Sequence, residues 1–325
     1  MRIKDIGGEF ALIERLSRIA AAGHADLIMG VGDDAAVIRT APPPTPYLLV
    51  TTDILVEDRH FVRQWARPDQ IGIKAVECNV SDIAAMGGKP SWMFISLVLS
   101  DDADLSWAEN LYEGIAAACR RRHVVLAGGD TTLGTNNVIN ITLLGNVAQD
   151  HVCLRSHARA GDRLMVTGTL GASAAALALL QKGIQPSGYL LDKHLAPTCR
   201  LDEAQTIAPL AHAMIDISDG LGSEVHHICK QSDVSAKIES SAIPLHPDVL
   251  AAAAHLGCDP RDFALSGGED FELLFSIAPG KIDALRKTGL PCHDVGEIVT
   301  GPGLPELAEA DGNGIPLPGG YDHFK

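Results

Sequence analysis

The stretch DLSWAENLYEGIAAACRRRHVVLAGGDTTLGTNNVINITLLGNV, residues 104–147, joins one helical pattern to two strand patterns. Its first part, up to Arg122, predicts a helix, and Val124–Leu126 predicts a strand directly after it. Val138–Val147 alternates apolar and polar residues, as a half-buried strand does. Because helical and strand patterns alternate in the same way along the whole chain, we predict an α/β protein.

The remaining pattern divides the chain into two halves. Helices are predicted at 10–19, from Pro68 to Gly87-Gly88, after Gly171, after Gly220 and from Lys281, and strands at 35–39, 47–51, 164–166, 214–215 and 271–277. The pattern restarts near residue 150, and a turn at Gly161-Asp162 precedes the next strand. We therefore predict an N-terminal domain at 1–150 and a C-terminal domain at 151–325.

Composition excludes several classes of protein. A length of 325 residues fits two domains, and 46% hydrophobic with 21% charged residues excludes a mainly disordered chain. The 41 acidic residues outnumber the 26 basic ones and give a net charge of −15, so nucleic acid is an unexpected partner. The longest uncharged segment, Leu164–Gln181, contains Gly, Ser and Thr and predicts strand, turn and helix, so we expect no membrane span.

The cysteines and the N-terminus both suggest a cytoplasmic protein. Seven cysteines are scattered with no pair at CxxC spacing, which favours free thiols in a reducing compartment over disulfides or a zinc site. The chain begins with the charged residues Arg2, Lys4 and Asp5 and lacks the apolar stretch of a signal peptide.

Acidic residues recur in short motifs with small neighbours. The six motifs are Gly32-Asp33-Asp34, Thr51-Thr52-Asp53, Asn79-Val80-Ser81-Asp82, Gly128–Thr132, Asp216–Gly220 and Gly267–Asp270. Four of them directly follow apolar runs, and the ends of strands are where sites assemble in α/β folds. Their Gly, Ser and Thr residues let a ligand approach the backbone and add oxygen donors.

Asp82 is the most informative single carboxylate. On a helix from Pro68 it falls on a mostly apolar face with Ala75, Cys78 and Met86. An unpaired carboxylate costs several kcal/mol to bury there, so a metal ion, a lysine or an arginine should meet it.

Each motif also has a purely structural interpretation. A lone Asp after a strand is more often a helix N-cap than a ligand, and Gly128-Gly129-Asp130 alone could be a turn. His226 and His227, in the middle of a helix, are expected at the surface. Taken together, the six motifs favour one shared metal site, and its oxygen ligands favour Mg²⁺ over zinc. The chain contains no GxxxxGK[ST] phosphate loop and no GxSxG nucleophile elbow.

Seven ordered motifs resemble one enzyme family. They are GVGDDAAV (30–37), TTDILVE with HF (51–57, 60–61), NVSDIAAMGG (79–88), GGDTT (128–132), DISDGL (216–221), LSGGEDFEL (265–273) and GYDHF (320–324). The chain is similar over nearly its whole length to thiamine-monophosphate kinase, of the superfamily that includes aminoimidazole ribonucleotide synthetase and selenide, water dikinase.

The resemblance implies a fold, a reaction and an assembly. The fold would be a two-domain α/β (α+β) architecture, with N-terminal sheets pairing into a barrel across a homodimer and a C-terminal α/β sandwich. The reaction would transfer phosphate from ATP to thiamine monophosphate and yield thiamine diphosphate. Several Mg²⁺ ions would assist.

The resemblance also implies a role for each matching residue. The Mg²⁺ ligands would be Asp34, Thr51, Thr52, Asp53, Asp82, Asp130, Asp216 and Asp219, and Asp130 and Asp219 would be catalytic. The nucleotide would contact the Gly129-Asp130 turn, Arg155, Ser218 and Tyr112, while thiamine phosphate would contact His60, Glu269 and Tyr321. Asp58-Arg59 departs from the Gly and apolar residue usual in the family, so the resemblance does not define the shape of the loop that presents His60.

The chemistry explains why such a site needs several cations. The acceptor is a phosphate monoester with a second pKa near 6, so it is mostly dianionic and needs no strong general base. Six aspartates bring a charge of about −6, and ATP together with thiamine monophosphate brings roughly −6 more. We therefore predict at least three Mg²⁺ ions in the site. We also predict direct in-line transfer of the phosphoryl group.

Three alternative functions stay open at this stage. Other ATP-dependent members of the superfamily would carry a Cys in residues 1–30 or at the C-terminus, and this chain has neither. A non-catalytic protein that binds divalent ions would bind metal without turning over ATP. A glycosidase would need two facing acids in an aromatic cleft, and three Trp and four Tyr argue against one.

Overall fold

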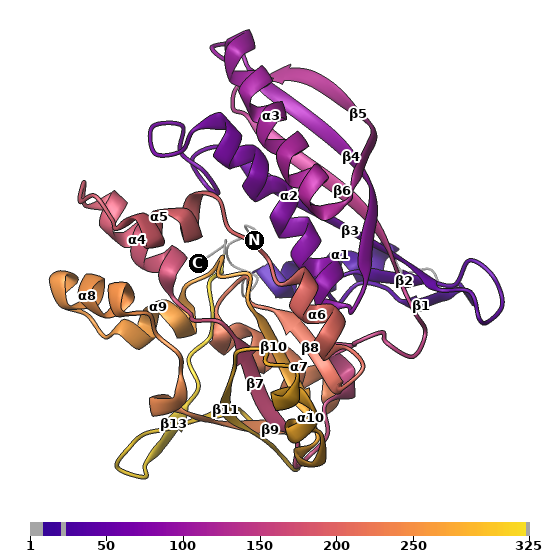
Figure 1. The fold of residues 1–325 in the computed structure, drawn as a ribbon, viewed down its shortest axis with the longest axis vertical. Helices are drawn as coiled ribbons and strands as arrows, with labels where there is room; N and C mark the ends of the chain where they lie inside the picture. The colour runs from indigo at the N-terminus through magenta and orange to yellow at the C-terminus, as the bar shows by residue number, and fades with distance from the viewer. Residues whose placement is uncertain (1–8, 21–23, 323–325) are drawn as a thin grey trace.

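Two β-sheets, one in each half of the chain, form the framework of the computed structural model (Figure 1). The structure describes residues 9–20 and 24–322. The charged N-terminal residues and the last two residues of the GYDHF motif lie outside these ranges. Within them, none of the helices is both long and apolar enough to cross a membrane.

The first sheet has the strand order β1-β2-β3-β6-β4-β5. Its strands are β1 (Leu27–Met29), β2 (Ala36–Ile38), β3 (Tyr47–Val56), β4 (Lys89–Ser100), β5 (Val125–Gly134) and β6 (Val138–Val147). Helices α2 (Pro68–Ala85) and α3 (Leu105–Arg122) cover one face (Figure 1). On that face Met93 and Ile95 are buried, whereas Trp92 and Phe94 on the opposite face are exposed. One face of this sheet is therefore bare in the single chain.

The second sheet has the order β13-β12-β9-β11-β7-β10-β8. Its strands are β7 (Arg163–Thr167), β8 (Ala211–Asp216), β9 (Ser235–Glu239), β10 (Leu273–Ile277), β11 (Cys292–Val299), β12 (Glu306–Ala308) and β13 (Gly314–Pro316). The helices of this half are α4 (Ala172–Gln181), α5 (Gly188–Leu195), α6 (Leu201–Ile207), α7 (Leu221–Ser232), α8 (Pro247–Leu256), α9 (Pro260–Ser266) and α10 (Ile282–Lys287). The mixed α/β fold with two sheets agrees with the predicted class. The domain boundary near residue 150 stays a prediction.

Helix α2 joins the two halves through one continuous core. Pro68 occupies its first turn, and the Gln70 side chain accepts a hydrogen bond from the Arg67 backbone N–H. Ile83 on α2 and Met214 on β8 belong to the same buried apolar cluster. Because α2 packs against both sheets, any side chain on its inner face lies where the two halves meet.

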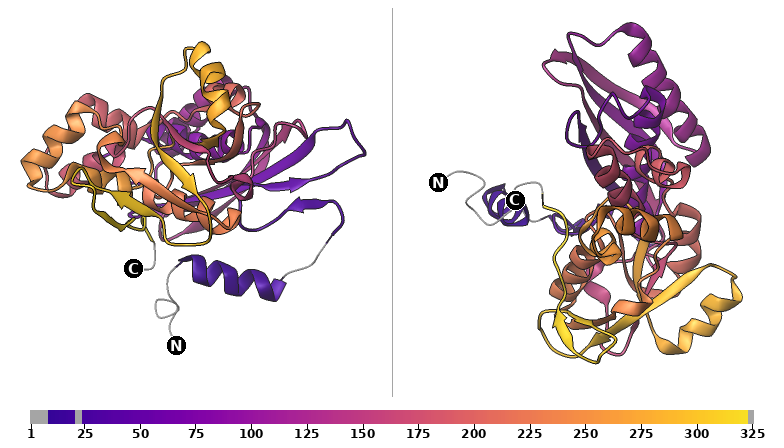
Figure 2. Two further views of the ribbon diagram at one scale, coloured as in Figure 1. Left: turned by 90° about the horizontal axis from the view of Figure 1, so that it is seen from below. Right: turned by 90° about the vertical axis from the view of Figure 1, so that its left-hand side faces the viewer.

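Helix α1 (Glu9–Ala20) lies outside these layers, next to the C-terminal segment (Figure 2). The Glu9 backbone N–H donates to Asp322 Oδ1 at 3.2 Å. The two ends of the described chain therefore meet, and Glu9 reaches the pocket described below.

Some local predictions are wrong. Gly129-Asp130 is not a turn, because β5 continues through it to Gly134. The motif Thr51–Asp53 lies inside β3 and not beyond its end, and the apolar run before Glu269 belongs to helix α9. Histidines 226 and 227 are half-buried, and His226 Nε2 lies 3.1 Å from the Leu317 carbonyl oxygen.

Candidate active site

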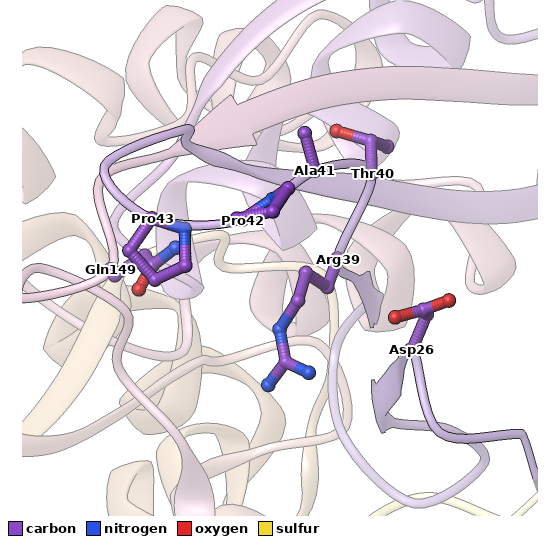
Figure 3. Close-up of a pocket in the computed structure, with 7 residues that line it drawn as sticks. All are labelled: Asp26, Arg39, Thr40, Ala41, Pro42, Pro43 and Gln149. Atoms are coloured by element: carbon purple, nitrogen blue, oxygen red, sulfur yellow. The ribbon is translucent and has the colours of Figure 1, made fainter.

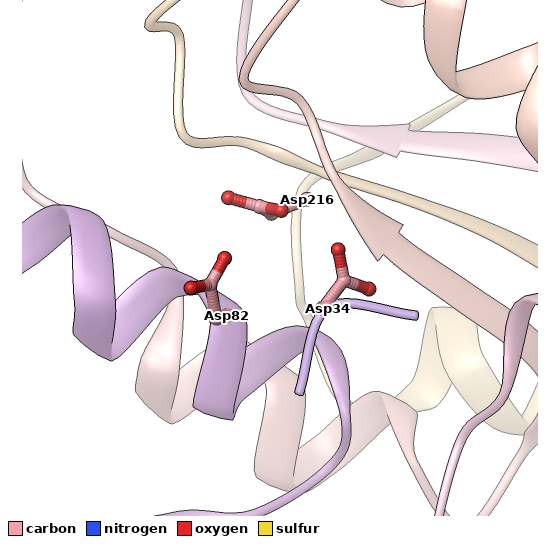
Figure 4. Close-up of side chains that lie close together, drawn as sticks. All are labelled: Asp34, Asp82 and Asp216. Carbon is pink, nitrogen blue, oxygen red and sulfur yellow. The ribbon is translucent and has the colours of Figure 1, made fainter. Parts of the chain in front are cut away.

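Three carboxylates from distant parts of the chain meet where the two halves join. Asp34 precedes β2, Asp82 lies on the inner face of α2, and Asp216 ends β8. One ligand oxygen of each lies within 4.8 Å of the others, and the three side chains point toward one another (Figure 4). The fold thus brings together acids that lie up to 182 positions apart in the sequence.

Four carboxylates of this site resist ionisation in the protein alone. Burial and then the charges of neighbouring carboxylates raise the pKa of Asp82 and that of Asp216 well above the usual value. The same causes raise the pKa of Asp53 to about 6 and that of Asp219 to about 7. The site therefore lacks positive charge and suits a ligand that supplies it.

Hydroxyl groups orient two of the carboxylates. Thr51 Oγ1 donates to Asp82 Oδ2 at 2.5 Å, and Ser81 Oγ donates to Asp216 Oδ2 at 2.6 Å. Thr51 lies on the covered face of β3, directly over α2. These bonds fix where the carboxylates point but do not remove their mutual repulsion.

Arg155 is the cation nearest the acids. It lies on a short 3₁₀ helix, Arg155–His157, between the two sheets. Its guanidinium forms an ion pair with Asp34 and lies 3.5 Å from Asp33 Oδ1, and its backbone N–H donates to Asp33 Oδ2 at 3.1 Å. Burial and the charge of Asp34 raise the pKa of Asp33 to about 7. A single guanidinium thus balances only part of the negative charge.

Two loops of the second half lie side by side under the acids. The Glu269 backbone N–H donates to the Ser218 carbonyl at 2.7 Å, and the Phe271 N–H donates to the Ile217 carbonyl at 2.9 Å. A Cβ on Gly268 would lie 2.3 Å from the Ser218 carbonyl oxygen. Only glycine permits this approach, which explains why the acidic motif carries glycines beside its carboxylates.

A pocket of about 360 Å³ connects the acids to an apolar wall. Asp53, Asp82, Asp216 and Asp219 line one part of it, and Leu177 with Ala178 of α4 line another. The predicted site residues His60, Ser218, Glu269 and Tyr321 also line this pocket. His60 Nδ1 accepts a hydrogen bond from the Val56 N–H at 3.0 Å, so in the neutral ring the proton is on Nε2.

Seven predicted residues are absent from the lining of this pocket: three of them, Asp34, Thr51 and Arg155, belong to the acid cluster or contact it, and the other four do not. These four are Thr52, Gly129, Asp130 and Tyr112. Thr52 pairs with Thr142, which in turn pairs with the exposed Phe94, and Asp130 pairs with the exposed Ser96. Because paired residues point to the same side of a sheet, Thr52 and Asp130 lie on the bare face. Within one chain they are separated from the acids by the thickness of the sheet.

Sequence reasoning missed several polar residues of the site. Lys74 on α2, Ser173 on α4 and His194 on α5 surround Glu269, and Glu224 on α7 accepts a hydrogen bond from the Asp219 N–H at 3.0 Å. The available signal for Lys74 is its spacing: residues 74, 78 and 82 follow at four-residue intervals and lie on one helix face.

A second hollow lies at the base of the β2–β3 connection (Figure 3). It measures about 460 Å³, and its lining comprises Asp26, Arg39, Thr40, Ala41, Pro42, Pro43 and Gln149. None of the predicted site residues is among them, so we place the candidate active site in the acidic pocket.

Comparison with known proteins shows which family the chain resembles along nearly its full length. Residues 32–147 match AIR synthase related protein, N-terminal domain, and residues 159–305 match AIR synthase related protein, C-terminal domain. Thiamine-monophosphate kinase from Haemophilus influenzae is 37% identical, with 98% of each chain covered, and that from Escherichia coli K12 is 36% identical with the same coverage. The solved structure of AaThiL complexed with AMPPCP and TMP superposes with a TM-score of 0.87 at 33% identity, covering 99% of each chain.

Proposed function

Because this chain belongs to the thiamine-monophosphate kinase family, within the AIR synthase related proteins, we propose how its pocket performs that family's reaction. The protein phosphorylates thiamine monophosphate with ATP and forms thiamine diphosphate. The observation that carries our assignment of the site is that the acid cluster and the predicted substrate residues line or adjoin one pocket.

The donor set fits Mg²⁺. Asp34, Asp82 and Asp216 present carboxylate oxygens within 4.8 Å of one another, and Asp53 and Asp219 line the same pocket. Hard oxygen ligands of this kind favour Mg²⁺ over softer metals. When bound, Mg²⁺ would neutralise charge on the polyphosphate and on the transferring group.

The chain's own residues position two anions for direct transfer. We assign Arg155 to the nucleotide phosphates, since its guanidinium already faces the acidic end of the site. The apolar wall at Leu177 and the ring of Tyr321 accommodate the organic part of the acceptor. Burial raises the pKa of the Cys78 thiol well above its usual value, so this cysteine of the pocket is not a thiolate nucleophile. An in-line transfer without a phospho-enzyme fits this set of residues.

A homodimer would complete the site. Within one sheet, Asp130 pairs with Ser96, Ser96 with Asn140 and Asn140 with Ile54 on β3, so β5 and β3 lie three strand spacings, about 14 Å, apart. One chain therefore cannot bring Thr52 and Asp130 to the same ion. Two bare sheet faces packed about a twofold axis would set β5 of one subunit opposite β3 of the other.

The exposed residues of the bare face support such an interface. Trp92, Phe94 and Val125, which pairs with Trp92, are between 43% and 57% exposed in the single chain. Apolar side chains gathered on one sheet face mark a surface that a partner covers. We also infer a cytoplasmic location, in which the seven cysteines, all of them free, stay reduced.

A coupled assay tests the function. Purified protein with Mg²⁺ and ATP should form thiamine diphosphate from thiamine monophosphate and not from unphosphorylated thiamine. Metal binding without turnover of either substrate would instead identify a binding protein and contradict the proposal.

A further inference from the structure

One buried ammonium group connects the two sides of the pocket. The Lys74 side chain is only 3% exposed, and its Nζ lies 2.6 Å from Glu269 Oε1. The same Nζ donates to the His60 carbonyl oxygen at 2.9 Å. His60 belongs to the first half of the chain and Glu269 to the second, so Lys74 holds two predicted substrate residues at once.

The second oxygen of Glu269 is held by neutral groups. Ser173 Oγ donates to Glu269 Oε2 at 3.4 Å, and His194 Nδ1 lies 3.5 Å from the same oxygen and 2.9 Å from Ser173 Oγ. Burial, and then the charge of Lys74, lower the pKa of His194 to about 4, so its imidazole is uncharged at neutral pH. Within this cluster, Lys74 therefore supplies the largest favourable charge beside Glu269.

This balance decides the protonation state of Glu269. Burial by itself would raise the pKa of Glu269, but the charge of Lys74 and its direct contact with the carboxylate outweigh burial and lower the pKa. Without the ammonium, a carboxylate in this setting would take up a proton and lose its fixed orientation. About a quarter of the Glu269 side chain, 27%, stays exposed, so the ionised group still faces the pocket.

We propose that Lys74 is a positioning residue for the organic part of thiamine monophosphate: it presents Glu269 as an oriented carboxylate and fixes the loop that carries His60. The inference depends on the proposed function of this pocket. Lys74 lies eight residues before Asp82 on α2, a rise of about 12 Å, so it acts at the end of the site remote from the acid cluster.

The test separates binding of the acceptor from every other step. Lys74→Met should raise KM for thiamine monophosphate by about tenfold or more, because the buried carboxylate loses its partner. KM for ATP and kcat should change by less than about threefold, since neither depends on this end of the pocket. Calorimetric Kd for thiamine monophosphate should rise in parallel with KM. Lys74→Arg, which keeps the charge, should recover at least half of the loss on a logarithmic scale.

The matched control is another buried ion pair on the same helix. Glu77 on α2 pairs with Arg122 of α3 at 2.7 Å, away from the pocket, and both side chains are at most 6% exposed. Arg122→Met should lower Tm at least as much as Lys74→Met and leave both KM values unchanged.

The outcomes distinguish the inference from the function beneath it. If wild-type protein forms no thiamine diphosphate, the proposed function fails. If wild-type protein is active and Lys74→Met changes only Tm, as Arg122→Met does, Lys74 is merely structural and the inference is overturned. Equal increases in KM for thiamine monophosphate and for ATP would overturn the inference as well.

Discussion

Individual carboxylates of the site are placed for a bound cation at the expense of the stability of the protein alone. Asp219 shows this, because burial, and then the charges of Glu9 and Asp53, raise its pKa to about 7. We predict that Asp219→Asn lowers kcat by about 100-fold or more and raises Tm of the metal-free protein. Steady-state kinetics and thermal denaturation measure both effects. Asp283→Asn, an exposed residue of α10, is the control and should change neither.

The same pKa values predict how stability depends on pH. Asp33 and Asp219, with pKa values of about 7, and Asp53, at about 6, bind protons more tightly in the folded state than in the unfolded chain. The metal-free protein should therefore gain about 1 kcal/mol as pH falls from 8 to 6.5. His194 and His227, with pKa values of about 4, offset part of the gain from the acids, because they stay neutral in the fold while the unfolded chain takes up protons.

Thermal denaturation at several pH values, with and without Mg²⁺, measures this dependence. Saturating Mg²⁺ should abolish the gain between pH 8 and 6.5, since the bound ion keeps the carboxylates ionised. If Tm of the metal-free protein fell steadily as the pH was lowered from 8, the pKa values of these carboxylates would not be raised as the structure indicates.

Single elements position the site through close backbone contacts, and Gly268 gives the clearest test. A Cβ there would lie 2.3 Å from the Ser218 carbonyl oxygen, so Gly268→Ala should push the two acidic loops apart. We expect a loss of about 1–3 kcal/mol in unfolding free energy and a higher KM for thiamine monophosphate. Gly280→Ala is the matched control, because nothing lies within 4 Å of its Cβ position. Equal effects of both substitutions would refute the steric argument.

Elements also show what the sequence could predict. Helix α2 and strand β6 were predicted nearly to the residue, because periodic apolar positions, a proline start and a glycine stop are local signals. Strand β4 was not predicted, and β5 was cut short at Leu126 and followed by a turn at Gly129. Exposed glycines and threonines in β5 lack the local pattern of a strand, which only pairing with β4 supplies.

Site residues that belong to a local sequence motif were predictable, whereas those that reach the site only through the fold were not. Asp82 is an acid on an apolar helix face, and this local pattern by itself indicates that the carboxylate needs a partner. His194 carries no such signal, and Lys74 carries only its four-residue spacing from Cys78 and Asp82, since lysine and histidine are usually solvated and only the fold brings them to Glu269.

At the scale of the whole molecule, the position of Asp130 makes the assembly testable. If the partner's Asp130 completes each site, Asp130→Asn and Asp82→Asn remove residues contributed by different subunits to the same site. Each variant alone should be nearly inactive. A mixed dimer would contain one site with both substitutions and one with neither.

Mixing the two inactive variants should therefore restore activity. Random exchange of equal amounts makes about half of all dimers mixed, and half of their sites are intact, so activity should recover to about a quarter of the wild-type value. Mixing Asp82→Asn with Asp216→Asn is the control and should restore nothing, because both acids belong to one chain's cluster. Mass spectrometry should verify that the subunits exchange. If they exchange and activity does not recover, Asp130 acts in the site of its own subunit or lies outside the site. The two bare sheet faces would then need a different arrangement.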